Sequence, residues 1–240
     1  MFRFIRWPLE RRVLLGAVVS LFSLLLVAFG VYNVVSALRD DNVSLPQEGT
    51  IDDIVSQATG PALGDAAVTP APPLGPLPVR MVVPRLYMDA PVIAMGVDAE
   101  NNPEVPGRPD QVAWYTFTAT PASDSNAVFT GHVDWQTRTG APIPGVFYRL
   151  RELQIGDDIV LTLEDGSQAT YRVTGNVATK YDDPNVVRSM GPTSKDVITL
   201  ITCGGTWLAG APGPYGGNYS HRVVVRAELV TPAVAAAPAG

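Results

Sequence analysis

The stretch Val197-Ile198-Thr199-Leu200-Ile201-Thr202-Cys203-Gly204-Gly205 ends on the only cysteine among 240 residues. Its β-branched side chains favour a pleated, half-buried strand, and the glycine pair allows close approach to the backbone just past the end of that strand. We therefore expect a strand that holds the Cys203 side chain rigidly while leaving it open to a cleft. A lone free cysteine more often behaves as a small buried hydrophobe. Cys203 alone therefore does not indicate catalysis, and other reactive residues must be found near it.

Short apolar segments of the same kind follow one another through residues 79–230, with glycine, proline and aspartate between them. The Asp165-Gly166 pair is typical of a tight hairpin turn. Helical signal is sparse, with one or two turns near residues 145–150. The pattern predicts an all-β domain of roughly 150 residues, built as an eight-stranded barrel or sandwich. The eight predicted strands are residues 79–83, 91–95, 111–114, 127–132, 158–163, 169–179, 197–203 and 222–229.

Net charge and the counts of cysteine and histidine exclude several functions. The net charge is -6 and the pI is about 4.9, with no basic stripe in the body of the chain, so nucleic acid is not expected as a partner. One cysteine cannot form an intramolecular disulfide, and one cysteine with two histidines does not make a zinc site. No acidic cluster stands out as a calcium site. We expect neither a metal nor a cofactor.

The N-terminal region predicts attachment to a membrane. Four arginines in residues 1–12 precede residues 13–38, a run of 26 residues without a charge. A helix of that length reaches roughly 39 Å, more than a hydrocarbon core of about 30 Å. We expect a single-pass signal-anchor in the cell membrane, with a cytoplasmic N-terminus. The Pro-rich residues 39–78 then form an extracellular linker, residues 79–230 the folded domain and residues 231–240 a disordered tail.

Two histidines are available as a base for Cys203, and their contexts differ. His132 closes the apolar run 127–132, which gives it the same strand-to-loop placement as Cys203. His221 immediately precedes Arg222 at the head of the last predicted strand. Because successive strand side chains point to opposite faces, His221 and Arg222 should not both face one site. We therefore choose His132 as the base.

Arg222 is the third candidate for the site. Its parity in the last strand places it with Arg226 and Glu228, away from the apolar positions of that strand. A guanidinium beside a thiol can donate hydrogen bonds to a developing oxyanion or a substrate carbonyl, and it favours the thiolate. A solvated charge on a polar strand face is the alternative for any single arginine.

Three blocks occur in an order that resembles the sortase family: Thr130-Gly131-His132, then Thr199-Leu200-Ile201-Thr202-Cys203, then Arg222 followed by three valines. Between them, Val82-Val83-Pro84-Arg85-Leu86, Glu104-Val105-Pro106, Val112-Ala113-Trp114-Tyr115 and Gly145-Val146-Phe147-Tyr148-Arg149-Leu150 are also similar to sortase sequence. The resemblance covers roughly residues 79–230, and it is strongest to the class E and F sortases.

The resemblance implies a sortase-type eight-stranded β-barrel and a cysteine transpeptidase. Cys203 would be the nucleophile, His132 the general acid/base and Arg222 the oxyanion or substrate-positioning residue, with Thr202 as a further residue of the groove. Such an enzyme cleaves a C-terminal sorting motif of the Leu-Pro-x-Thr-Gly type on an exported protein and forms a thioester on its cysteine. An amine of a cell-wall precursor or another acceptor then takes the acyl group.

Two alternatives remain open at the level of the sequence. A cysteine hydrolase would use the same three residues, with water in place of the amine. A non-catalytic, membrane-tethered β-domain that binds a surface protein or wall polymer would instead keep Cys203 buried and inert.

Overall fold

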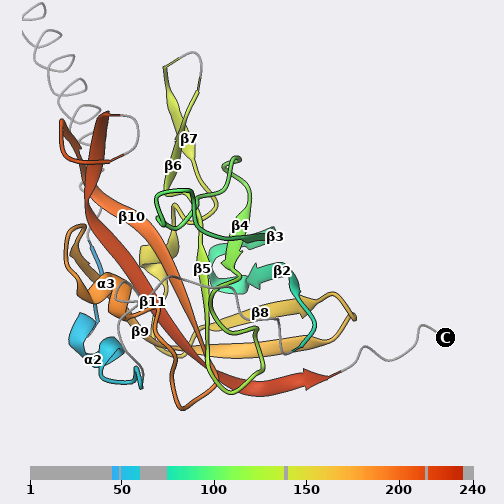
Figure 1. Ribbon diagram of the computed structural model, residues 1–240. Coiled ribbons are helices and arrows are strands. Elements are labelled where there is room, and N and C mark those ends of the chain that lie inside the picture. The colour runs from blue at the N-terminus through green and yellow to red at the C-terminus, as the bar shows by residue number, and fades with distance from the viewer. Residues whose placement is uncertain (1–44, 49, 60–74, 138–139, 214–215, 235–240) are drawn as a thin grey trace, which may run out of the picture. The chain divides into compact units, whose positions relative to one another are not determined.

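The computed structural model describes residues 45–48, 50–59, 75–137, 140–213 and 216–234 (Figure 1). The predicted cytoplasmic segment and membrane span, residues 1–12 and 13–38, lie outside these ranges. Within them, no helix has the length and apolar character needed to cross a membrane.

Eight strands close into a barrel (Figure 1). Neighbouring strands follow the order β9-β11-β10-β5-β4-β3-β2-β8, and the ring is complete because β8 also pairs with β9. All pairs are antiparallel except β3 with β4 and β10 with β5. The barrel strands are β2 (Pro78–Val83), β3 (Met88–Met95), β4 (Val112–Tyr115), β5 (Asn126–Thr130), β8 (Asp158–Leu163), β9 (Gln168–Lys180), β10 (Val197–Ala209) and β11 (Gly217–Val234).

All eight predicted strands are present. Seven of them differ from the prediction at one or both ends, and three of these differences bear on the candidate residues or the predicted tail. β5 stops at Thr130, so His132 lies in the loop that follows it. β10 and β11 run past the barrel and pair with each other as a hairpin, which places Cys203 within a strand instead of at its end. β11 also continues to Val234, into the segment predicted to be a disordered tail.

The barrel interior is filled by the alternating apolar side chains that the sequence predicts, because period-two alternation sends every second residue to one face. Each fully buried Leu, Ile, Val or Phe side chain contributes about 1.5–3 kcal/mol. The largest buried residues of this interior cluster are Met81, Phe129, Phe147, Leu150, Ile159, Leu161, Leu163, Tyr171, Ile198 and Leu200.

A second apolar cluster lies on the outer face of the sheet, beneath helix α2 (Ile51–Val55). Ile54 of α2 is buried there together with Val128, Ile201 and Val224. Thr50 caps α2: its hydroxyl accepts from the Asp53 amide, and the Asp53 carboxylate accepts from the Thr50 amide. This reciprocal capping box stabilises a helix too short to persist alone.

Strand β1 (Gln47–Glu48) pairs with Asn176 and Val177 of β9. The β8 pairing uses only Gln168 to Arg172 of that strand, so the rest of its edge is free to receive β1. Part of the segment expected to be an extended linker therefore packs on the barrel, because β1 offers backbone hydrogen bonds and Ile54 an apolar side chain.

The remaining elements are short. Strands β6 (Asp134–Gln136) and β7 (Pro142–Pro144) form a separate hairpin that projects from the barrel in Figure 1. Helix α3 (Asn185–Arg188) lies between β9 and β10. Two 3-10 turns complete the list, η1 (Pro84–Leu86) and η2 (Leu150–Glu152), and η2 falls at the end of the predicted helical turns near residues 145–150.

Candidate active site

Strand register brings the three candidate residues toward one place on the outer face of the barrel. Cys203 in β10 is the direct cross-strand partner of Arg222 in β11. On the other side of β10, Ile201 pairs with Thr130 of the parallel strand β5. His132 follows Thr130 by two residues, as Cys203 follows Ile201, so the histidine segment runs on beside the cysteine strand. The central strand thus carries the thiol, with the arginine and the histidine supplied by its two neighbours.

Thr202 joins the cysteine strand to the histidine segment. Its hydroxyl donates to the carbonyl oxygen of Gly131 at 2.8 Å, and the Thr130 hydroxyl donates to the carbonyl oxygen of Ile201 at 3.1 Å. Thr202 is only 4% exposed. It therefore fixes the residues before His132 against β10, and its hydroxyl does not line an open groove.

Backbone packing holds the His132 segment from the opposite side. The Phe147 amide donates to the His132 carbonyl at 2.9 Å. A β-carbon at Gly145 would lie 2.3 Å from that carbonyl oxygen, and one at Gly131 would lie 2.6 Å from Val146 Cγ1. The two glycines thus let the segments touch, and larger residues there would push His132 away.

The His132 ring has two neighbours. Its Nε2 lies 2.6 Å from the carbonyl oxygen of Pro106, and Trp135 meets the ring edge to face at 5.0 Å between centroids. A carbonyl oxygen only accepts, so Nε2 carries a proton in this contact and Nδ1 is the ring nitrogen left to accept one.

A β-bulge follows Cys203 in its strand. Gly204 pairs with His221 and Trp207 with Tyr219, so β10 holds one more residue than β11 between these pairs. Gly205 adopts the positive φ of +76° that such a bulge requires, and a β-carbon there would lie 2.2 Å from Ser220 Oγ. The bulge sets the twist of the hairpin that rises beside the thiol.

Arg222 is half-buried and is oriented by the residues just before it in β11. Its Nη2 donates to Asn218 Oδ1 at 2.8 Å, and its Nη1 donates to the His221 carbonyl at 3.0 Å. The His221 side chain instead hydrogen-bonds Ser220 through Nδ1 at 2.8 Å.

Burial and charge act in opposite directions on the Cys203 thiol. Burial raises the pKa of Cys203, the positive charge of Arg222 lowers it and the negative charge of Asp134 raises it, so the net shift is upward. The thiol is nevertheless partly exposed. At neutral pH the resting residue is therefore a thiol that a base must deprotonate.

Asp134 and Tyr219 are site residues that the sequence analysis did not select. The Tyr219 phenol donates to Asp134 Oδ2, a contact between residues 85 apart. Burial, followed by that carboxylate, raises the pKa of Tyr219. The only sequence signal was the position of Asp134, two residues after His132.

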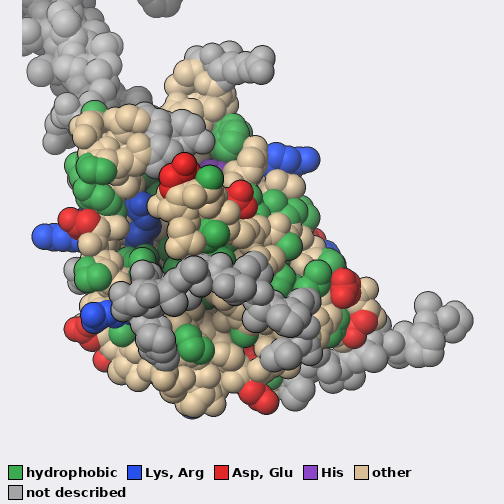
Figure 2. Space-filling view, viewed as in Figure 1, with side chains coloured by type: hydrophobic (Ala, Val, Ile, Leu, Met, Phe, Trp, Pro, Cys, Tyr) green, Lys and Arg blue, Asp and Glu red, His purple; other side chains and the backbone are tan. Residues whose placement is uncertain are grey.

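Figure 2 shows a depression in which basic side chains are visible, with acidic side chains and a histidine beside it. In the part of the chain that the structure describes, no three His, Cys, Asp or Glu residues are grouped so as to hold a metal ion.

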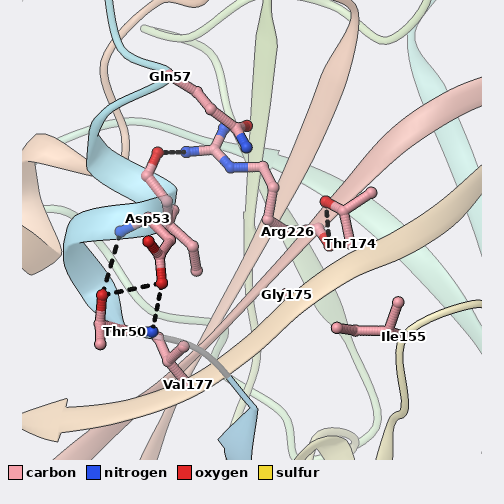
Figure 3. Close-up of a pocket in the computed structure, with 9 residues that line it drawn as sticks. Thr50, Asp53, Gln57, Ile155, Thr174, Gly175, Val177 and Arg226 are labelled. Carbon is pink, nitrogen blue, oxygen red and sulfur yellow. Dashed lines mark hydrogen bonds between the residues drawn. The ribbon is translucent and has the colours of Figure 1, made fainter.

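A separate cleft of about 260 Å³ lies between α2 and β9 (Figure 3). It contains none of Cys203, His132 and Arg222. Arg226 lines it, and Figure 3 shows the Gln57 side chain lying next to the guanidinium. Arg226 donates to the carbonyl oxygens of Ile54 at 3.4 Å and Ser189 at 3.1 Å. These contacts tie α2 to β11, so we assign the cleft a structural role.

The fold and the site define a closed β-barrel protein with a partly exposed cysteine on its outer face beside an arginine. The family model of the sortase domain matches residues 81–230 of the chain. The chain therefore belongs to the sortase family.

Solved structures with similar folds are also sortases. Sortase C1 of GBS Pilus Island 1 is 23% identical, with a TM-score of 0.43 over 64% of this chain and 65% of that one, so the chain spans slightly less than two thirds of its length. A Clostridium perfringens sortase D5 transpeptidase is 19% identical (TM-score 0.43; 64% and 79% covered). Sortase A of Listeria monocytogenes is 19% identical (TM-score 0.45; 67% and 92% covered). The search among curated proteins found no match.

Proposed function

We propose that this protein is a membrane-anchored cysteine transpeptidase that cleaves a sorting motif of the Leu-Pro-x-Thr-Gly type and transfers the acyl part to an amine. Membership of the sortase family supports the reaction class. The observation that carries the assignment of residues is the pairing of Cys203 with Arg222 across β10 and β11, with the His132 segment on the other side of β10.

In the first half of the reaction, His132 takes the proton of Cys203 through Nδ1, and Sγ attacks the carbonyl carbon of the scissile peptide bond. Arg222 donates a hydrogen bond to the oxygen that becomes negative. The C–N bond then breaks, His132 gives its proton to the departing amine, and a thioester remains on Cys203.

In the second half, an amine attacks the thioester carbon and loses a proton to His132. Arg222 again faces the developing oxyanion. The C–S bond breaks, the sulfur takes the proton back, and a new amide is released. Water in place of the amine gives hydrolysis as a side reaction, because the same three groups serve it.

The location and partners follow from the N-terminal sequence. Residues 13–38 form a signal-anchor, so the barrel lies outside the cell, where exported proteins with a sorting motif and amine acceptors such as a cell-wall precursor are present. Resemblance around Cys203-Gly204-Gly205 and residues 215–222 supports assignment to class E or F.

Incubating the protein with a sorting-motif peptide and a competent amine tests the proposal. We expect the amide adduct, its loss in Cys203→Ala and His132→Ala, and its retention in the matched variant His221→Ala. Hydrolysis alone in the presence of the amine would support a hydrolase. Resistance of native Cys203 to iodoacetamide until the protein unfolds would support a non-catalytic domain.

A further inference from the structure

Two hairpins lie near Cys203, and a contact between Tyr219 and Asp134 joins them. The first is formed by β6 and β7 directly after His132, and the second by the ends of β10 and β11. Tyr219 of the second hairpin donates its phenol proton to Asp134 of the first. The Tyr219 ring also meets Trp207 edge to face at 5.3 Å between centroids. Tyr219 is thus held in place by the hairpin on one side, and it fixes the Asp134 carboxylate on the other.

Tyr219 and its neighbours in β11 also connect the Asp134 carboxylate to the Arg222 guanidinium. Arg222 donates to the Tyr219 carbonyl at 3.5 Å and to Asn218 Oδ1 at 2.8 Å. The Tyr219 amide donates to the same Asn218 oxygen at 2.9 Å. One short segment of β11 therefore orients Arg222 through backbone and amide groups, and Asp134 through the phenol. Both charges act on Cys203, and they act in opposite directions.

The groups that interact electrostatically with the thiol come from three strands. Arg222 and Tyr219 belong to β11, Asp134 to β6 and Tyr115 to β4. His132, the proposed base, lies in the loop after β5. Among the described residues, Asp134 is the carboxylate that acts on the Cys203 charge, and Arg222 is the cation. Both tyrosines are neutral at physiological pH, since the pKa of each is raised, that of Tyr115 to about 12.

We propose that Asp134, oriented by Tyr219, is a positioning residue that opposes Arg222 at Cys203 and adds to the effect of burial, so that the cysteine gives up its proton to His132 when a substrate binds. Asp134 neither gains nor loses a proton in the reaction. The thiol proton passes to the His132 imidazole and returns, as in the proposed transpeptidation. The role of Asp134 during turnover therefore rests on that proposed function. A resting thiol on an exposed site is also less open to oxidation than a thiolate.

The test follows the rate of Cys203 alkylation by iodoacetamide against pH in the full chain, which needs no sorting peptide. Asp134→Asn keeps an oxygen that can accept from Tyr219 but removes the charge. A change of half to one pKa unit alters the thiolate fraction about threefold to tenfold. We expect alkylation near pH 7 to become faster by this factor, with its inflection at lower pH. The profile should be retained in Asp134→Glu and in the distant control Asp158→Asn.

Two further variants separate electrostatics from loss of structure. Arg222→Ala should shift the alkylation profile in the opposite direction, to higher pH. Tyr219→Phe keeps the ring against Trp207 and releases the Asp134 carboxylate, so it should shift the profile in the same direction as Asp134→Asn but by a smaller amount.

An unchanged or slower rate in Asp134→Asn, with the melting temperature retained, would overturn the proposal. So would an Asp134→Glu variant that behaves like Asp134→Asn. A protein that alkylates as expected but forms no amide would instead contradict only the proposed transpeptidation.

Discussion

Arg222 and Arg226 lie four residues apart on the same outward face of β11, and their surroundings are different. Arg222 is half-buried, pairs across the sheet with Cys203 and donates to Asn218. Arg226 is fully buried, pairs with Thr199 and donates to two backbone carbonyls. Burial lowers the pKa of Arg226 to about 10, so it stays charged at neutral pH. One arginine faces the site and the other supports the fold.

What separates the two arginines is the segment that covers them. Helix α2 and the turn around Ser189 lie over Arg226 and accept its hydrogen bonds. Neither covers Arg222. Among the described residues, no hydrogen-bond partner is present for Nε and Nη1 of Arg226, and the Glu228 carboxylate acts on its charge only partly against the effect of burial. A strand pattern alone gives both residues the same role, and the cover supplied by residues 50–59 decides between them.

Of the changes that test the comparison of the two arginines, replacing Arg222 should have the largest effect on the reaction. Loss of one oxyanion donor costs about 100-fold to 1,000-fold in rate, so Arg222→Ala should lower kcat by this factor with little change in melting temperature. Steady-state transpeptidation and thermal unfolding measure the two quantities. If Arg222→Ala destabilised the protein as much as removal of a buried arginine would, Arg222 would be a structural residue like Arg226.

Weakening the packing of helix α2, which covers Arg226, should lower the stability of the protein more than its catalytic rate. Ile54 of α2 is 2% exposed and packs in the outer cluster. Ile54→Ala should lower the free energy of unfolding by about 2–4 kcal/mol, the usual cost of truncating a buried aliphatic side chain. Urea unfolding gives the value, and Ile143→Ala, at a residue 42% exposed, is the matched control. An equal, small loss in both variants would show that α2 is not part of the folded unit.

Crowding His132 should reduce activity without touching a charged group. In Gly145→Ala the added methyl would meet the His132 carbonyl, which must move. Overpacking of this kind costs about 1–3 kcal/mol, and we expect activity to fall about tenfold. Gly140→Ala, where nothing lies within 4 Å of the added carbon, controls for the surface hairpin, although its φ of +89° adds some strain. Full activity in Gly145→Ala would show that His132 does not need this contact.

Arg226→Met should have the smallest effect. Apolar replacement of a buried charge is often neutral or stabilising because its desolvation penalty is removed. The carbonyl oxygens of Ile54 and Ser189 lose a donor, which offsets part of the gain. We expect a melting temperature within a few degrees of the wild type and unchanged kcat. A large loss of activity would place Arg226 with Arg222.

Much of the barrel could be predicted from local pattern. Eight strands and the Asp165-Gly166 turn follow from alternation and turn residues, and Gly166 adopts the expected positive φ of 82°. Strands β1, β6 and β7 have two or three residues each, too few to show a period, and β7 begins and ends with proline. The docking of α2 was not predictable either, because five helical residues gain their stability from the barrel beneath them.

Some residues of the candidate site could also be predicted from the sequence, and others could not. Cys203, His132 and Arg222 stand out in the sequence because each lies beside a strand-forming run and carries reactive chemistry. Asp134 and Tyr219 do not, since their importance comes from a contact between two hairpins. The resemblance predicts Thr202 as a groove residue, whereas its position facing Gly131 depends on the register of β10 and β5.

Intact-mass analysis of the full chain with a sorting-motif peptide, in the absence of an added amine, tests the central claim most directly. We expect a covalent acyl adduct that maps to Cys203, is absent from Cys203→Ala and disappears when an amine is added, as the amide forms. Amide product in the Cys203→Ala variant, or an adduct that maps to another residue, would contradict it.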